Sequence, residues 1–324
     1  TELLGSNDLK DAALQKDGLL FRSKATLDVR KDSAILGSLD KYRSGLQQSI
    51  GERLSAGGSV SLAAEGAVIT HDTSRIDISG GQVTNTAADV RATQLMSETG
   101  VLYDMNSAPA DLRYTQALNL QRSAAAGYDR WGVQVSYGHL TPSRHEDGYV
   151  EGRAAGRFSV VAPTVRLGNE LDAQVVAGER QQMGMDRPAT GGALSVGAVR
   201  NGTQDFASVT YAGGAVLSDF SIDAAGPTVN AALWLDPVLG ELPVASGMRL
   251  ARLQDAGLAS VAVAAEGDVR LNGDDPAARL VLADGASLRL LSSEGTTQLG
   301  GQLSSHAGSV ELRAKAGQVT VNEA

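Results

Sequence analysis

The chain has 324 residues, a formal net charge of −9 and no cysteine. The absence of cysteine excludes disulfides and thiolate metal sites, and the acidic balance argues against nucleic-acid binding, because phosphate contacts need clustered lysine and arginine. Aromatic residues are only 4% of the chain while glycine occurs 38 times, so we do not expect a core built on packed rings.

A short helix is the first element that the pattern predicts, near residues 37–54. Leu39, Leu46 and Ile50 recur there at helical spacing, and Ser38 is a candidate N-cap.

A strand–turn–strand unit recurs along the rest of the chain. It is clearest at 58–68, returns at 259–269 and again at 308–319, and has weaker relatives that begin at Gly156 and Gly192. Apolar and small polar residues alternate in each copy, which predicts a strand with one apolar face. Glycine follows where the chain must turn sharply. Such internal repeats are typical of stacked, solenoid architectures.

Stacking explains the composition of the chain. One strand–turn–strand unit cannot bury its apolar face, but each copy can cover the next. A narrow interior favours valine, leucine and alanine over rings. The sequence therefore predicts an all-β fold, a parallel β-helix. The alternative is an antiparallel sandwich or barrel, for which we would expect more aromatic residues and tight Asn-Gly hairpins.

The predicted coils are interrupted twice. Residues 1–96 are expected to form coils with the short helix, and 97–155 an aromatic-rich excursion packed on the rod. Residues 156–324 are expected to form coils again, with a smaller excursion near 223–250 that contains Trp234.

The larger excursion is where recognition is expected. Four rings lie close together in a chain otherwise poor in them, namely Tyr128, Trp131, Tyr137 and Tyr149. Tyrosine and tryptophan stack on sugars and anchor protein interfaces, so these residues are candidate contacts for a saccharide or a partner protein. The alternative is that they form the small core of the excursion itself.

Charged clusters predict neither a metal site nor a catalytic site. Residues 144–147 read Arg-His-Glu-Asp, with His139 nearby, but the spacing matches no closed metal motif and indicates a solvated loop. Asn272 and the aspartates after it do not form the glycine-aspartate repeat that binds calcium in other solenoids. No catalytic, cofactor-binding or metal-ligating residue is therefore assigned.

A polysaccharide-cleaving enzyme with this fold would need catalytic carboxylates on neighbouring coils. Parallel β-helix enzymes that cleave polysaccharides place two or three carboxylates on one face. The candidates are Asp268 with Asp274 and Asp275, or Asp77 with Asp89. Most aspartates in this chain flank glycine, where they are expected to accept hydrogen bonds from turn backbone.

Residues 57–197 resemble a known family. The stretch is similar to the domain of unknown function shared by filamentous-haemagglutinin-type exoproteins, large adhesins that bacteria export by two-partner (type V) secretion. The matching segments are 58–62, 65–66, 75–81, 93–95, 102–105, 108–109, 114, 130–133, 148–152, 155–156, 178–181 and 191–194. Residues 1–56 and 198–324 match only the general repeat style of such proteins.

The resemblance implies a secreted adhesin at the bacterial cell surface with a right-handed β-helical fold. It implies export through an outer-membrane barrel transporter, no cofactor, and a role in cell adhesion or biofilm contacts with host or matrix glycans or surface proteins. The family has no established catalytic residues, so none is carried over. The chain begins at Thr1 without an export segment and lacks the recognisable secretion-signal domain, which predicts a piece of a longer exoprotein.

The sequence is also compatible with two functions other than adhesion. One is a β-helical glycoside hydrolase or lyase that degrades polysaccharides. The other is a rod that presents a toxin beyond its end. No run of about 18 apolar residues occurs, so membrane insertion is not expected.

Overall fold

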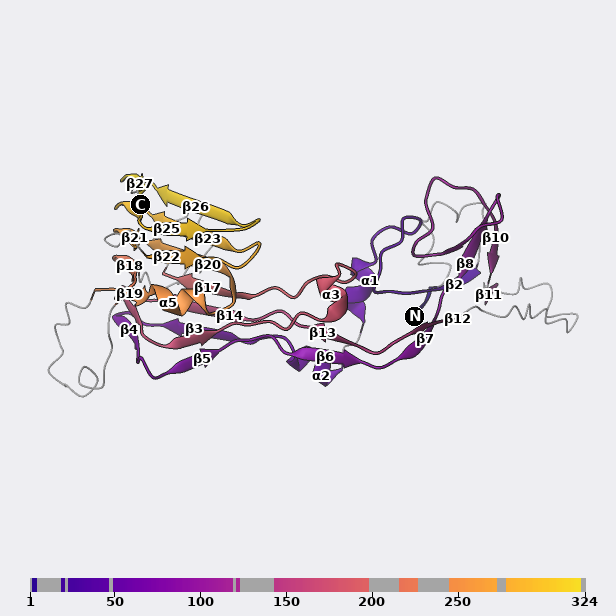
Figure 1. The fold of residues 1–324 in the computed structure, drawn as a ribbon, viewed down its shortest axis with the longest axis horizontal. Coiled ribbons are helices and arrows are strands. Elements are labelled where there is room, and N and C mark those ends of the chain that lie inside the picture. The colour runs from indigo at the N-terminus through magenta and orange to yellow at the C-terminus, as the bar shows by residue number, and fades with distance from the viewer. Residues whose placement is uncertain are drawn as a thin grey trace, which may run out of the picture. The chain divides into compact units, whose positions relative to one another are not determined.

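The computed structural model describes residues 2–4, 19–20, 23–46, 49–118, 121–122, 143–197, 216–226, 245–272 and 278–321. These residues are mostly strand, with a few short helices (Figure 1). The chain divides into two compact units. Unit 1 comprises residues 1–49 and 85–149, and unit 2 comprises residues 50–84 and 150–324.

Unit 2 is built on two long parallel sheets. In spatial order, the first contains β3 (Ser59–Ala63), β14 (Arg157–Val161), β17 (Gly192–Val196), β20 (Leu258–Ala265), β23 (Ser287–Ser292) and β26 (Ser309–Ala314). The second contains β4 (Ala67–Thr70), β15 (Thr164–Leu167), β19 (Gly247–Arg249), β18 (Phe220–Asp223), β21 (Val269–Leu271), β24 (Thr297–Leu299) and β27 (Val319–Val321). Shorter parallel pairs join β5 (Arg75–Asp77) to β16 (Glu170–Asp172), and β22 (Arg279–Val281) to β25 (Gln302–Ser304).

The predicted repeat corresponds to the layers of this stack. The first strands of the three clear copies are β3, β20 and β26, and the weaker relatives are β14 and β17, so all five lie in the first sheet. The second strands of the clear copies, after the turn, are β4, β21 and β27 of the second sheet. Pairing in both long sheets is parallel throughout, which confirms the mostly-β fold with stacked parallel strands and contradicts an antiparallel sandwich for unit 2.

Two ladders of apolar side chains run through the layers of the first sheet. Their members lie in direct register on successive strands, the first ladder being Val60, Phe158, Leu194, Val261, Leu288 and Val310, and the second being Leu62, Val160, Val196, Val263, Leu290 and Leu312. The middle members are buried and belong to one continuous core. Burying each such side chain stabilises the fold by about 1.5–3 kcal/mol, so the ladders hold the stack together.

The alternating positions on most strands carry small or charged residues. Ser59 and Ser61 on β3 are exposed, and Arg289 on β23 pairs with Glu311 on β26 through an Nε–Oε2 contact of 2.7 Å. These strands show the period-two alternation that the sequence predicts, whereas Ser159 on β14 is buried.

Glycine is required where two layers turn at the same place. A Cβ atom built on Gly156 would lie 1.7 Å from the carbonyl oxygen of Gly58 in the layer below. The backbone there donates to the neighbouring layer, because the Gly156 N–H bonds to the oxygen of Ile78 at 2.7 Å. Close backbone approach, rather than a positive φ, explains this glycine.

Gly156→Ala is therefore expected to lower the free energy of unfolding of unit 2 by on the order of 1–3 kcal/mol, since the backbone must shift to admit the methyl group. Urea unfolding followed by circular dichroism measures the change. Gly66→Ala is the matched control, because no atom lies within 4 Å of its added Cβ. Equal unfolding midpoints for the two variants would contradict the close-packed turn.

Unit 1 is made of small antiparallel sheets. β2 (Ser23–Leu27) lies between β1 (Glu2–Leu4) and β11 (Gln121–Arg122), β8 (Gln94–Ser97) lies between β9 (Leu102–Asp104) and β10 (Tyr114–Leu118), and β7 (Ala88–Arg91) pairs with β12 (Ser143–Glu146). Two small clusters form its core. They are Leu20, Ala25, Leu27, Leu39 and Met105, and Ile35, Leu95 and Ala108.

The predicted boundaries differ from these units. Residues 2–4 and 23–27, predicted as coils, pair in antiparallel sheets, and residues 1–49 share unit 1 with most of the stretch predicted as the excursion 97–155. The helix predicted near 37–54 is two short helices, α1 (Asp40–Gly45) and α2 (Ile50–Leu54), because the backbone becomes extended at Leu46. Apolar spacing alone does not reveal such a break.

The smaller excursion predicted near 223–250 also ends inside the sheet. Its final residues form β19, which lies between β15 and β18, followed by α5 (Leu250–Gln254). Residues 227–244 lie outside the described part of the chain. The remaining described elements are β6 (Gln82–Asn85), β13 (Tyr149–Gly152) and α3 (Glu179–Gln182). Among the described residues, we find no helix with the length and apolar character needed to cross a membrane.

Candidate functional site

Only one of the four rings predicted as contacts can be placed. Tyr128, Trp131 and Tyr137 lie outside the described residues. Tyr149 is half-buried in unit 1, where its hydroxyl accepts a hydrogen bond of 2.9 Å from Nη1 of Arg30. The Arg30 guanidinium also lies 5.9 Å from the centre of the Tyr149 ring, within the range of a cation–π contact. This ring therefore packs against an arginine of its own unit.

Arg30 is the centre of a charged network in unit 1. Its guanidinium forms a two-pronged ion pair with Asp28, with Nη2–Oδ2 at 2.6 Å and Nε–Oδ1 at 2.8 Å. It also reaches Glu146 on β12 at 2.8 Å, and Glu146 pairs in turn with Arg144. Burial raises the pKa of Asp28, but the hydrogen bonds and charge of Arg30 outweigh it and hold that pKa below its usual value. The network fastens the turn after β2 to β12.

Acid is therefore expected to weaken unit 1. A carboxyl group whose pKa is lowered by folding contributes stability above its unfolded pKa and loses it as pH falls through the folded value. The protection factors of unit 1 amides in hydrogen exchange, which correct for the pH dependence of the intrinsic rate, should fall below about pH 4, the ordinary aspartate range. Arg30→Met should lower these protection factors already at pH 6 and flatten their acid dependence. Arg113→Met is the control, because its exposed ion pair with Glu98 spans 3.6 Å; a similar effect of both variants would contradict the role of Arg30.

The sequence predicted a solvated loop at residues 144–147, but the structure shows a strand there. Residues 143–146 form β12, whose partner β7 places Asp89 directly opposite His145. The His145 ring lies 3.0 Å from an Asp89 carboxylate oxygen and 3.7 Å from one of Asp147, all three side chains being exposed. Sequence reasoning missed the strand because its charged residues hide the alternation. Within the described part of the chain, no three histidine or acidic side chains are grouped as metal ligands.

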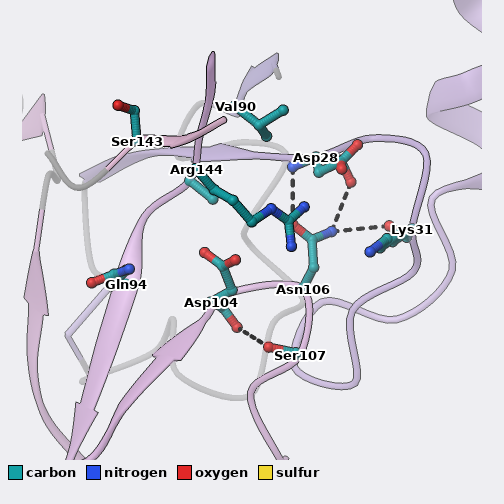
Figure 2. A pocket seen from close by; sticks show the side chains of 10 residues that line it. Asp28, Lys31, Val90, Gln94, Asp104, Asn106, Ser107, Ser143 and Arg144 are labelled. Carbon is teal, nitrogen blue, oxygen red and sulfur yellow. Dashed lines mark hydrogen bonds between the residues drawn. The ribbon is translucent and has the colours of Figure 1, made fainter. Parts of the chain in front are cut away.

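A pocket of about 260 Å³ lies within unit 1 (Figure 2). The turn after β2, the strands β7, β8, β9 and β12, and the turn after β9 supply its walls. The residues that line it are Asp28, Lys31, Val90, Ala92, Gln94, Asp104, Asn106, Ser107, Ser143 and Arg144. Eight of these ten side chains are polar or charged, and the other two, Val90 and Ala92, are apolar, so the pocket offers both kinds of contact.

Strand register brings the key side chains of the pocket together. Gln94 on β8 is directly opposite Asp104 on β9, and Arg144 on β12 is directly opposite Val90 on β7. Figure 2 shows the Arg144 guanidinium and the Asp104 carboxylate directed toward the same space. A cation and an anion from different sheets thus line one hollow.

Asn106 holds one wall of the pocket in place. Its Nδ2 donates to the carbonyl oxygens of Asp28 and Lys31, at 2.7 and 3.0 Å, while its Oδ1 accepts from the Asp28 N–H at 2.9 Å. Three hydrogen bonds from this one side chain hold the turn after β2 against the turn after β9, and the Ser33 hydroxyl adds a fourth by donating to the Met105 carbonyl oxygen at 2.7 Å. The wall is therefore built before any ligand arrives.

Two groups of the pocket are left without hydrogen bonds among the described residues. The Gln94 Oε1 atom is buried and has no partner, and the Asp104 carboxylate accepts no hydrogen bond. An unmet acceptor in a buried position is costly unless something supplies a donor. Sequence reasoning did not select these residues for a site, although both fall within segments that carry the family resemblance.

Of the aspartates considered for catalysis, Asp77 is the last residue of β5, Asp89 lies on β7, and Asp268 lies between β20 and β21. Asp77 accepts the Ser79 N–H at 2.9 Å, and Asp268 accepts the Thr296 N–H at 2.8 Å. Asp274 and Asp275 fall in the part of the chain that the structure does not describe.

A second hollow lies in unit 2, between α5, the start of β20 and the end of β22. Its volume is about 380 Å³, and Gln174, whose Nε2 donates to the Asp255 carbonyl oxygen at 2.8 Å, crosses one side. Leucine and valine side chains form much of the rest, as a continuation of the core. This hollow offers fewer polar groups than the pocket of unit 1.

The chain matches no protein-family model, no curated protein and no solved structure.

Proposed function

We propose that this chain is a segment of a large secreted adhesin, in which unit 2 is a right-handed parallel β-helical rod that acts by display and contact rather than by chemistry. The chain would be exported through an outer-membrane barrel transporter and held at the bacterial surface. There it would contact glycans or proteins of host cells, of the matrix or of a biofilm. The observation that carries the proposal is the pair of apolar ladders through successive layers of unit 2.

Variable spacing between equivalent residues supports a scaffold for display. Arg289 and Glu311 are 22 positions apart, Ser260 and Ser287 are 27 apart, and Thr70 and Asn169 are 99 apart, yet each pair joins neighbouring layers. The layers keep their geometry while the chain between them varies. Repeat architectures accept insertions in this way and use them for binding.

Composition supports export. The net charge of −9 favours solubility of the unfolded chain, and the absence of cysteine means that an oxidising compartment cannot trap it in disulfides. Both properties suit a chain that crosses a membrane unfolded.

Surface display is tested on intact cells of the producing bacterium. Antibodies raised against this segment should label those cells, and external protease should remove the label. Deletion of the partner transporter should abolish labelling while the polypeptide remains detectable in lysate. Labelling that appears only after the cells are permeabilised would contradict the proposal.

The alternative of a polysaccharide-degrading enzyme has one observation in its favour. Asp77 on β5 and Asp172 on β16 are direct register partners on neighbouring layers. Both carboxylates, however, are already engaged, Asp77 with the Ser79 N–H and Asp172 with Arg75. The Ser79 hydrogen bonds lower the pKa of Asp77, whereas a general acid needs a raised one.

The enzyme alternative is decided by assay. Purified protein should release no reducing ends from polygalacturonate, alginate or neutral glucans over long incubation. Release that disappears in both Asp77→Asn and Asp172→Asn would favour the enzyme.

A further inference from the structure

We propose that the pocket of unit 1 binds a neutral, hydroxyl-bearing ligand, a single sugar ring such as the terminal residue of a glycan. This deepens the adhesin proposal by naming the ligand class of one site, and its biological role rests on that proposal. The site uses Gln94, Asp104 and Arg144, none of which is among the four aromatic residues that the sequence singled out.

Some groups that line this pocket are already engaged and one is not. Asn106 and Asp28 are held by the hydrogen bonds and ion pairs described above, so they form a rigid frame. The half-buried Asp104 carboxylate, by contrast, is directed into the hollow (Figure 2), and no described residue donates a hydrogen bond to it. A preformed frame around an unmet acceptor is what a binding site for a hydrogen-bond donor requires.

The charges around the pocket are balanced. Two acidic side chains, Asp28 and Asp104, and two basic ones, Lys31 and Arg144, line it, and the ion-pair partners of Asp28 and Arg144, namely Arg30 and Glu146, also carry opposite charges. No ion pair joins Arg144 to Asp104, although both are directed into the hollow (Figure 2). A ligand between them must donate to the carboxylate and accept from the guanidinium. A hydroxyl group does both without bringing a charge of its own, and adjacent hydroxyls match the planar ends of these side chains.

The size of the pocket suits a single ring. Its volume of about 260 Å³ exceeds the roughly 150 Å³ of a cavity that holds one benzene ring. Val90 and Ala92 form an apolar patch beside the polar groups. A sugar ring has the same mixture, hydroxyls at its edge and C–H groups on its face.

The proposal is tested by calorimetric titration of the whole chain with methyl α-D-glucoside, methyl α-D-galactoside and methyl α-D-mannoside. At least one of these should bind, and Asp104→Asn should weaken that binding on the order of tenfold, as expected for loss of a charged hydrogen-bond partner. Asp111→Asn is the matched control, since it removes the same charge from an exposed position of unit 1 that does not line the pocket. Circular dichroism verifies that each variant keeps its fold.

Other outcomes overturn the proposal in identifiable ways. Binding of glycine or acetate in place of the three glycosides would assign the pocket to ionic ligands. Binding of none of these probes, or equal weakening in Asp104→Asn and Asp111→Asn, would remove the pocket as the site. Surface labelling of intact cells is independent of these titrations, so failure of the sugar site and failure of the adhesin proposal are distinguished.

Discussion

Phe158→Ala is expected to lower the free energy of unfolding of unit 2 by about 3–5 kcal/mol. The ring is fully buried and lies in register between Val60 on β3 and Leu194 on β17. Its removal leaves a cavity inside one layer, and the parallel strands on either side cannot close it without breaking their own register. Urea unfolding followed by circular dichroism measures the loss.

The neighbouring residue supplies the control for this experiment. Arg157 precedes Phe158 on β14 and is exposed, so Arg157→Ala should change the free energy of unfolding by no more than about 0.5 kcal/mol. If Phe158→Ala is as stable as Arg157→Ala, the apolar ladders do not hold the stack, and the β-helical rod loses its main support.

Gln181→Met is the second change with a large expected effect, on the order of 3 kcal/mol. Gln181 on α3 is buried, and its amide makes four hydrogen bonds to backbone. Oε1 accepts the N–H groups of Gly152 and Gly178, both at 2.9 Å, and Nε2 donates to the carbonyl oxygens of Gly152 and Arg187, at 3.1 and 2.9 Å. Methionine has a similar length but meets none of these groups, so several buried backbone groups lose their partners.

Glycine makes this arrangement possible. A Cβ atom on Gly152 would lie 1.5 Å from the carbonyl oxygen of Val176, so no other residue lets the two backbones approach and share one glutamine. Gln182→Met is the matched control, because Gln182 is exposed and makes a single hydrogen bond, to the carbonyl oxygen of Ala177 at 3.0 Å. Differential scanning calorimetry should show a large fall in Tm only for Gln181→Met. Equal values for both variants would show that the buried amide does not stabilise unit 2.

The sequence predicted the stacked strands of unit 2 but not the pocket of unit 1, and the difference has a physical reason. Each inward position of the stack meets the same position of the next layer, so the pattern must recur in the sequence, as it does at Val60, Val261 and Val310. The pocket depends on side chains that meet once, such as Gln94 and Asp104. A contact that occurs only once in the fold produces no repeating pattern in the sequence.

The sequence did not predict the layer that contains β23, for a related reason. β23 belongs to the same ladders through Leu288 and Leu290, but its outward residue, Arg289, stands in register with Ala262 and Glu311, so no common residue type marks this position. Outward positions are free to vary because solvent, not a neighbouring layer, surrounds them. Likewise, β19 could not be predicted as a layer between β15 and β18, since its place in the sheet reverses the order in the chain.

The amino-acid sequence alone determined that this protein is mostly β, that strand–turn–strand units repeat, and that aliphatic side chains greatly outnumber rings in its core. These properties follow from local alternation and from composition, which every layer must satisfy independently. Only the tertiary structure decided that residues 1–49 join residues 85–149 in an antiparallel unit, that β12 is a strand, and that Gln94, Asp104 and Arg144 line one pocket. Those results depend on contacts between segments far apart in the chain, which no local pattern encodes.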